Sequence, residues 1–188
     1  PAESLSLTVN TQPVMLTAGY AVYRAWRAAG GAAPSVVAGH SLGEYTALTA
    51  AQAVPLEAAL KLVRFRAQAM QEAVPAGSGG MAAILGLSDE QVAQACAEAA
   101  QGEVVEAVNF NAPSQVVIAG HAAAVGRACE AAKRRGAKRA LPLPVSAPFH
   151  CSLLAPAAQR LRERLRGEPI GSPQVAVINN IDVATESE

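Results

Sequence analysis

The stretch Ala38-Gly-His-Ser-Leu-Gly-Glu-Tyr45 contains a Gly-x-Ser-x-Gly motif centred on Ser41. A short apolar run, Val36–Ala38, comes directly before the motif, and an alanine-rich run that favours a helix, Tyr45–Ala53, follows it. Strand, sharp turn and helix are the context in which this pentapeptide presents a nucleophilic serine. The sequence therefore predicts an α/β fold with Ser41 exposed on the turn between a strand and a helix.

The residues around Ser41 also predict the geometry of the turn. We expect a strained backbone at the serine, and we expect side chains at Gly39 and Gly43 to collide with the neighbouring strand or helix. The backbone N–H of Leu42, in the first turn of the helix, would point at an oxyanion formed beside Ser41 Oγ.

Composition narrows the class of protein. The 188 residues carry no formal net charge and are 51% hydrophobic, which indicates a globular protein without a bias toward nucleic acid. No apolar run approaches the ~18 residues of a membrane span. Three cysteines without CxxC spacing indicate neither a disulfide framework nor a metal site, so we expect a cytoplasmic protein. Because the chain starts at Pro1 without Met and stops soon after a strand-like run, we expect a fragment of a longer protein.

The hydrophobic pattern divides the chain into an outer and an inner part. Helices are predicted at 11–30, 56–74 and 152–166, and strands at 35–38 and 174–178. The Gly-rich segment 75–80 is the strongest linker signal, and after it the order is β-α-β-β-α-β up to residue 145. This order predicts a ferredoxin-like subdomain over 76–146, inserted into a core formed by 1–75 and 147–188. The alternative is a single α/β sheet that continues through the whole chain.

A serine nucleophile needs a base, and the chain has three histidines. His40 adjoins Ser41, where neighbouring side chains diverge, and His121 starts a predicted helix. His150 lies in the loop that returns to the outer part, and loops leaving a sheet commonly carry catalytic groups. We therefore assign His150 as the base, against the alternative of an incidental loop histidine.

A conventional triad also needs a carboxylate between the serine and the histidine. Asp89 lies at a predicted helix start preceded by Ser88, and Asp182 follows His150, so neither has the expected position. This favours a Ser–His dyad, with His150 oriented by a backbone or amide group, over a Ser-His-Asp triad.

Arg66 lies off the polar stripe of its predicted helix and borders the apolar face. An arginine there must extend to solvent or meet a carboxylate, because an unpaired buried charge is costly. The alternative is a guanidinium that binds a substrate carboxylate.

With these residues in place, the chain resembles the malonyl-CoA:acyl carrier protein transacylases, the acyltransferase family of fatty-acid and polyketide synthesis. The matching stretches run in order along the chain: Thr11-Gln-Pro13, Gly39-His-Ser-Leu-Gly-Glu-Tyr45, Arg66 with Met70-Gln-Glu-Ala-Val-Pro75, Asn109-Phe-Asn-Ala-Pro113, Gln115-Val-Val-Ile-Ala-Gly120, and Leu141-Pro-Leu-Pro-Val-Ser146 through His150. The resemblance implies an α/β-hydrolase-like core carrying a ferredoxin-like subdomain.

The resemblance also implies roles. Ser41 would take malonyl from malonyl-CoA as an ester, His150 would act as base and then acid, and the acyl group would pass to the phosphopantetheine thiol of acyl carrier protein, without a metal or cofactor. Leu42 N–H would form part of the oxyanion hole. Arg66 would bind the malonyl carboxylate, with Phe149 and Asn111 as further substrate-binding residues.

Two parts of the family pattern are missing from these 188 residues: the Gly-Gln-Gly loop that supplies a second oxyanion donor, and the C-terminal segment that orients the histidine. We therefore expect little transacylase activity from the isolated polypeptide. The alternatives are an acyltransferase domain of a polyketide synthase, a serine esterase or thioesterase, and a non-catalytic module that docks carrier protein.

Overall fold

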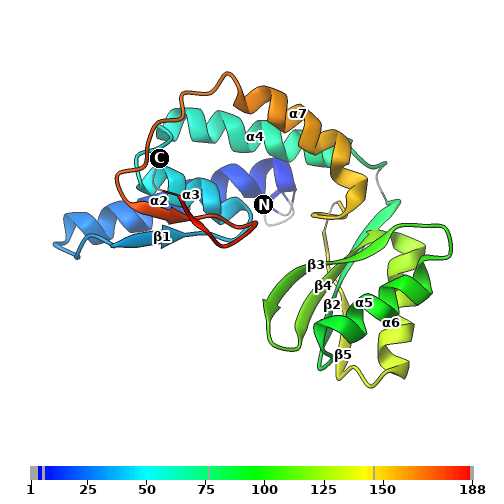
Figure 1. The fold of residues 1–188 in the computed structure, drawn as a ribbon. Coiled ribbons are helices and arrows are strands. Elements are labelled where there is room, and N and C mark those ends of the chain that lie inside the picture. The colour runs from blue at the N-terminus through cyan, green and yellow to red at the C-terminus, as the bar shows by residue number, and fades with distance from the viewer. Residues whose placement is uncertain (1–3, 6, 76, 146, 187–188) are drawn as a thin grey trace. The chain divides into compact units, whose positions relative to one another are not determined.

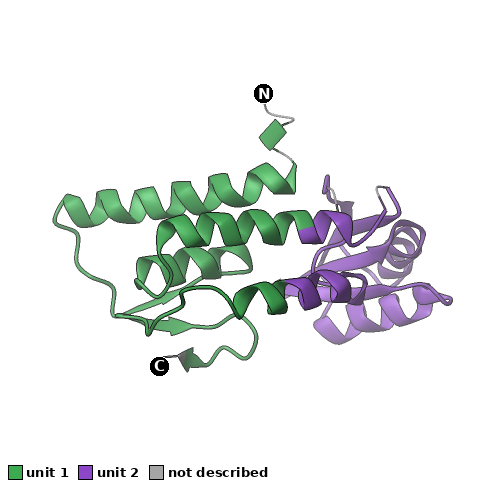
Figure 2. Ribbon diagram, turned by 90° about the horizontal axis from the view of Figure 1, so that it is seen from above, with its two compact units in different colours: residues 1–68, 161–188 green, residues 69–160 purple. Residues whose placement is uncertain are grey.

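A computed structural model of the chain describes residues 4–5, 7–75, 77–145 and 147–186. The chain separates into two compact units, Pro1–Gln68 with Leu161–Glu188 (unit 1) and Ala69–Arg160 (unit 2), shown in Figures 1 and 2. The unit limits fall inside helices α4 (Leu56–Glu72) and α7 (Ala155–Leu165). The domain limits expected from the sequence involve residues 76 and 146, which lie outside the described residues.

Unit 1 is a mixed α/β unit. It contains α2 (Thr8–Ala28), β1 (Val36–Ala38), α3 (Leu42–Ala50), most of α4, the end of α7, β6 (Ala176–Ile178) and β7 (Thr185–Glu186). Its sheet has the order β1-β6-β7, in which β1 and β6 are parallel and β6 and β7 antiparallel. Ala38 is paired with Ile178, so the ends of β1 and β6 open on the same edge of the sheet.

Small and branched apolar side chains form the core of unit 1. Leu16, Val54, Ala59 and Val63 make one buried cluster between α2 and the start of α4. Ala47 and Ala51 of the α3 segment pack on Val177 of β6. Because alanine side chains are short, α3 can lie close against the sheet, directly after the serine turn.

Unit 2 has its own sheet. The elements are β2 (Gly79–Leu85), α5 (Asp89–Ala100), β3 (Val105–Ala112), β4 (Gln115–His121), α6 (Ala122–Arg134), β5 (Arg139–Pro142) and the 3-10 turn η1 (Ser152–Leu154), which leads into α7. The strand order is β3-β4-β2-β5, and all three pairings are antiparallel. The predicted β-α-β-β-α-β order is confirmed, and these strands do not continue the sheet of unit 1.

Different segments pack against the two faces of this sheet. Alternate residues point to opposite faces of a strand. Ala82 and Ile84 of β2 point into the cluster formed with α5 and α6. Met81 of β2 and Ala119 of β4 point the other way, into a cluster that contains Cys151 and the half-buried Phe149. The segment around His150 therefore covers the sheet face that the helices leave free.

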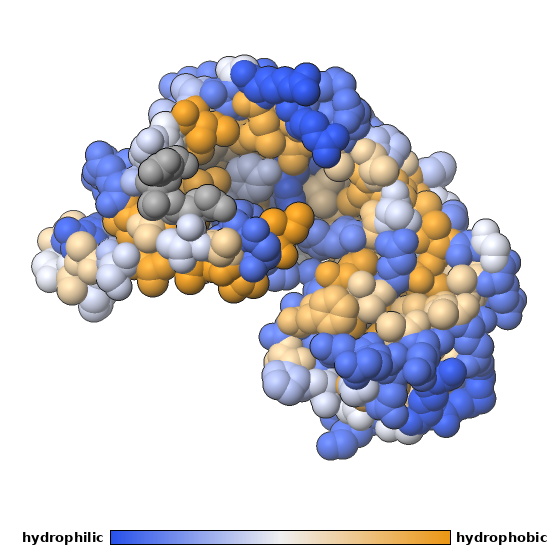
Figure 3. Space-filling view, viewed as in Figure 1, coloured by the Kyte–Doolittle hydropathy of each residue, from blue (hydrophilic) through white to orange (hydrophobic). Residues whose placement is uncertain are grey.

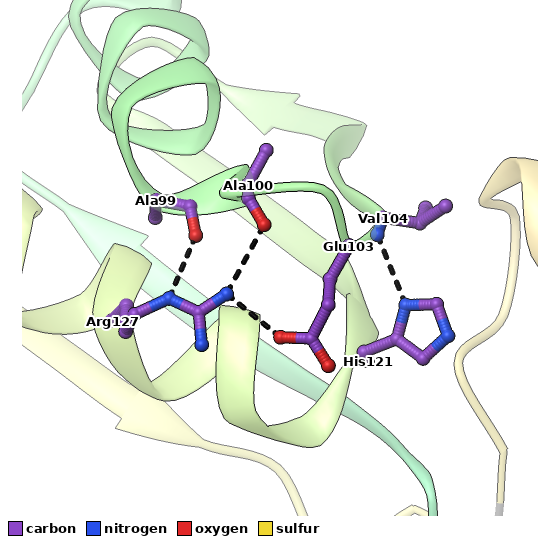
Figure 4. Close-up of polar contacts among 6 residues, drawn as sticks. All are labelled: Ala99, Ala100, Glu103, Val104, His121 and Arg127. Carbon is purple, nitrogen blue, oxygen red and sulfur yellow. Dashed lines mark hydrogen bonds and ion pairs between the residues drawn. The ribbon is translucent and has the colours of Figure 1, made fainter.

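The ends of α5 are satisfied by side chains. Ser88 and Gln91 form a capping box at its start, which confirms the predicted helix start after Ser88. At its end, Arg127 Nε donates to Ala99 O (2.8 Å), and Nη2 donates to Ala100 O (3.1 Å) and Glu103 Oε2 (2.7 Å), as Figure 4 shows. This arginine fixes α5 to α6 at the point where the chain turns into β3.

Hydrophilic and hydrophobic residues both lie over the helices, and hydrophobic surface gathers along unit 1 where β1 runs (Figure 3). Among the described residues, no helix is both long and apolar enough to cross a membrane. No group of three or more metal-binding side chains lies together in the described ranges. All three cysteines are buried free thiols.

Candidate active site

Ser41 lies in a strained turn between β1 and α3. Its backbone has φ 52° and ψ −107°, in the positive-φ half of conformational space that non-glycine residues seldom occupy. A side chain at Gly39 would lie 2.0 Å from the backbone carbon of Gly43, so the close approach of strand and helix requires this glycine. The predicted strained serine and the role of Gly39 are confirmed.

The expectation for Gly43 is wrong. A Cβ built at Gly43 meets nothing within 4 Å. The physical reason is that Gly43 lines a groove of about 500 Å³ along α2, which also includes Gly39, Met15 and Gly19. The two glycines of the motif therefore differ: a side chain at Gly39 would overlap neighbouring backbone atoms, whereas a side chain at Gly43 would not.

The serine turn is held by a residue that sequence reasoning missed. Asn180 Oδ1 accepts a hydrogen bond from the backbone N–H of Ser41 at 2.7 Å. Asn180 follows β6, and β6 runs parallel to β1, so both residues leave the sheet on the same edge. The position of Asn180 just after the predicted strand at 174–178 was the available signal, because carboxyl ends of parallel strands share one edge.

Arg66 is directed at the serine. It is buried (8% exposed), and its Nη2 donates to Ser41 Oγ at 3.0 Å. Its Nη1 donates to Gln12 Oε1 at 2.7 Å, and the guanidinium carbon lies 5.6 Å from the centre of the Tyr45 ring. Burial lowers the pKa of Arg66, against the opposing influence of Tyr45, yet a guanidinium remains charged at neutral pH.

Neither of the two structural expectations for Arg66 holds. Its side chain does not extend to solvent, and in the ranges that the structure describes no carboxylate forms a salt bridge with it. Against the effect of burial, Glu44 raises the pKa of Arg66 through its charge but forms no salt bridge with it. A buried guanidinium whose hydrogen-bond acceptors are neutral is suited to an anionic ligand, because a carboxylate can pair with it directly.

Gln12 was also missed as a site residue. It is 5% exposed, and its Nε2 donates to Thr8 Oγ1 at 2.9 Å, one turn earlier in α2. This bond fixes the amide so that Oε1 faces Arg66. Gln12 belongs to the stretch Thr11-Gln-Pro13, which resembles the family. It is a polar residue in a largely apolar helical run, and this was the signal for a buried polar contact. Tyr45 completes the surroundings, and burial raises the pKa of its phenol.

Leu42 is the first residue of α3, directly after Ser41. Amides in a first helical turn have no acceptor within their own helix, and the role of this N–H as an oxyanion donor stays a prediction. Unit 1 thus brings together Ser41, Leu42 and Arg66 among the predicted residues.

The other predicted site residues belong to unit 2. His150 is exposed, with φ 69°, at the end of a short turn, and Phe149 beside it packs half-buried on the sheet. Asn111 is exposed near the end of β3. The approach of these three residues to Ser41 stays a prediction.

The rejected candidates occupy structural positions. His121 is the N-cap residue of α6, at the predicted helix start, and its side chain makes no cap hydrogen bond there. Its Nδ1 accepts the Val104 N–H at 3.0 Å instead (Figure 4). Asp182 accepts the Ala184 N–H at 3.0 Å within a turn of unit 1. Asp89 lies in the first turn of α5.

Comparison with known proteins decides the family, because the acyl transferase domain model matches residues 1–188. The chain belongs to the acyl transferase domain family. It is 56% identical over 187 residues to the malonyl CoA-acyl carrier protein transacylase of Escherichia coli K12, covering 100% of this chain and 60% of that protein. Its identity to the Bacillus subtilis protein of the same name is 48%, covering 98% and 59%.

Solved structures of acyl transferases agree. The acyl-carrier-protein S-malonyltransferase of Burkholderia pseudomallei 1710b has a TM-score of 0.96 at 68% identity, covering 100% of this chain and 61% of that one. A malonyl-transacylase in complex with a type II polyketide acyl-carrier protein has a TM-score of 0.98 at 52% identity, with 100% and 61% covered. The predicted family resemblance is confirmed, and the chain spans about three fifths of the length of these relatives.

Proposed function

We propose that the full-length protein transfers a malonyl group from malonyl-CoA to the phosphopantetheine thiol of an acyl carrier protein, through an ester on Ser41. The observation that carries this proposal is the buried guanidinium of Arg66, whose Nη2 lies 3.0 Å from Ser41 Oγ and which forms no salt bridge with a carboxylate among the described residues. The names of the related proteins support the same donor and acceptor.

In the proposed first step, His150 removes the proton of Ser41 while Oγ attacks the thioester carbonyl. The Leu42 N–H donates to the oxyanion, and the coenzyme A thiolate leaves with the proton that His150 held. In the second step the carrier thiol gives its proton to His150 and attacks the ester. Breakdown of this second intermediate returns the proton to Ser41 Oγ. These steps need neither a metal nor a cofactor.

Selectivity for malonyl would come from Arg66. An acetyl group lacks a carboxylate and would leave the buried guanidinium without a directly paired anion, and a site built for a polar group strongly rejects an analogue without that group. Gln12 supports this role, because it holds Nη1 while Nη2 stays directed at the acyl site. Phe149 and Asn111 are the proposed further substrate-binding residues.

The finer description of the fold also belongs to this proposal. The parallel β1–β6 pair and the turn at Ser41 support an α/β-hydrolase-like core, and the strand order of unit 2 supports a ferredoxin-like subdomain. The domain limits proposed from the sequence are 1–75 with 147–188 and 76–146. The proposed location is the cytoplasm, where three buried thiols remain reduced.

The test is a comparison of acyl groups in the full-length protein. We expect Arg66→Ala to lower kcat/KM for malonyl-CoA by ~100-fold or more and to raise the ratio of acetyl to malonyl transfer. Arg64→Ala, on the polar stripe of α4, is the matched control and should leave both rates near wild type. An equal loss for both acyl groups would mean that Arg66 is structural, and release of free malonate in place of transfer would indicate a thioesterase.

A further inference from the structure

The turn that carries His150 is tied to the sheet of unit 2 by one carboxylate. We propose that Glu106 is a positioning residue for His150, acting through Ser152. This inference rests on the proposed function, because it takes His150 as the base.

Glu106 is well placed for this role. It lies half-buried in β3 and is paired with Ala119 of β4. Its neighbours Val104 and Val108 pack in the cluster on the sheet face opposite α5 and α6. By strand alternation Glu106 belongs to that face, which the segment around His150 covers.

Both carboxylate oxygens of Glu106 hold Ser152. The Ser152 backbone N–H donates to Oε2 at 2.8 Å, and the Ser152 hydroxyl donates to Oε1 at 2.6 Å, across 46 residues of sequence. Ser152 begins η1, which continues as α7, and the first amides of a helical run lack partners within it. An acidic group is also favourable at this positive end. Glu106 therefore fixes both the backbone and the side chain two residues after His150.

The residues before His150 are fixed as well. Pro148 is almost fully buried against the start of β2, where a Cβ on Gly79 would lie 2.4 Å from the proline Cδ. Cys151 Sγ donates to Pro148 O at 3.2 Å and closes the turn. His150 itself is exposed and has φ 69°. The segments on either side of it are both anchored to unit 2, and Glu106 is the polar anchor.

The test uses the full-length protein with malonyl-CoA and carrier protein. We expect Glu106→Ala to lower kcat by ~10- to 100-fold while KM for malonyl-CoA changes by less than ~3-fold, because misplacing a catalytic group acts on the chemical step. Glu106→Gln should recover most of the activity, since Oε1 can accept from the Ser152 amide and Nε2 can donate to the Ser152 hydroxyl. Glu103→Ala breaks the ion pair with Arg127 in the same unit, and as the matched control it should leave kcat near wild type.

Two further measurements separate the possible failures. Loss of Ser41 labelling by a fluorophosphonate in His150→Ala reports whether His150 assists the serine, and retained labelling would overturn the base assignment. If His150→Ala loses labelling but Glu106→Ala keeps wild-type kcat, the positioning role is wrong. It is also wrong if Glu106→Ala and Glu103→Ala lose activity equally in parallel with their melting temperatures. The double variant Glu106→Ala/Ser152→Ala should be no slower than Glu106→Ala alone, and additive losses would contradict action through Ser152.

Discussion

The two glycines of the serine motif offer a matched pair of substitutions. A Cβ at residue 39 would lie 2.0 Å from the Gly43 carbon, 2.1 Å from its oxygen and 2.4 Å from the Glu44 nitrogen. All three are backbone atoms, so no side-chain rotation relieves the overlap. An ordinary Cβ contact starts at 3.4 Å, so β1 and the first turn of α3 must separate by about 1.4 Å, the difference between 3.4 and 2.0 Å.

A displacement of this size acts on both stability and catalysis. Forced overpacking costs ~1–3 kcal/mol of unfolding free energy, and a 1 Å misplacement of reacting groups costs ~100-fold in rate. We therefore expect Gly39→Ala in the full-length protein to lose ~100-fold or more in malonyl transfer and to unfold at lower urea concentration. Gly43→Ala has open space at its Cβ, and alanine favours a helix over glycine.

The assay is malonyl transfer from radiolabelled malonyl-CoA to carrier protein, run beside urea unfolding for both variants. Gly43→Ala should stay within ~3-fold of wild-type activity. A tenfold loss of rate would need ~1.4 kcal/mol of additional activation free energy, and this substitution introduces little strain. Near-normal activity of Gly39→Ala, or equal losses in the two variants, would show that the contact between residue 39 and Gly43 does not hold the serine turn in place.

Three further outcomes are expected. Asn180→Ala leaves the Ser41 amide without its 2.7 Å acceptor and should lower kcat by ~10-fold. Asn180→Asp keeps an acceptor and should lose less activity. Equal losses in single-turnover kinetics would contradict the role of Asn180 in holding the serine turn. Burial raises the pKa of Cys96 to about 11, so at pH 8 about one thiol in a thousand is ionised, and Ellman's reagent should label this residue only after denaturant is added. The Ala184 N–H lowers the pKa of the Asp182 carboxyl in the folded protein. The carboxylate charge therefore stabilises the fold above the unfolded pKa of about 4, and this stabilisation is lost as the pH falls through the lower folded pKa. The melting temperatures of wild type and Asp182→Asn should differ at pH 7 and converge in acid.

Local patterns in the sequence were sufficient for most elements. The helix predicted at 56–74 is observed as Leu56–Glu72, because its apolar residues recur at helical steps. The start of the helix after Ser88 was also predicted, and it is observed as a capping box. The short strand Thr185–Glu186 was not predicted, since two residues carry no period and its pairing with β6 is set by the fold.

The site could be predicted only where a local motif or a helical face pointed to it. Ser41 was found from its pentapeptide and Arg66 from its place on the apolar face of α4. Gln12, Asn180 and Glu106 were missed because each acts through a partner far along the chain, 54, 139 and 46 residues away respectively. Such contacts come from tertiary packing, so the neighbouring residues can mark a polar position but do not identify its partner.

The most direct test of the account is to find the atom that carries the acyl group. Full-length protein would be mixed with radiolabelled malonyl-CoA, quenched in acid and digested, and the labelled peptide identified by mass spectrometry. We predict one malonyl ester on Ser41, absent in Ser41→Ala and discharged when carrier protein with its phosphopantetheine thiol is added. Label on another residue, or label that persists in Ser41→Ala, would contradict the account.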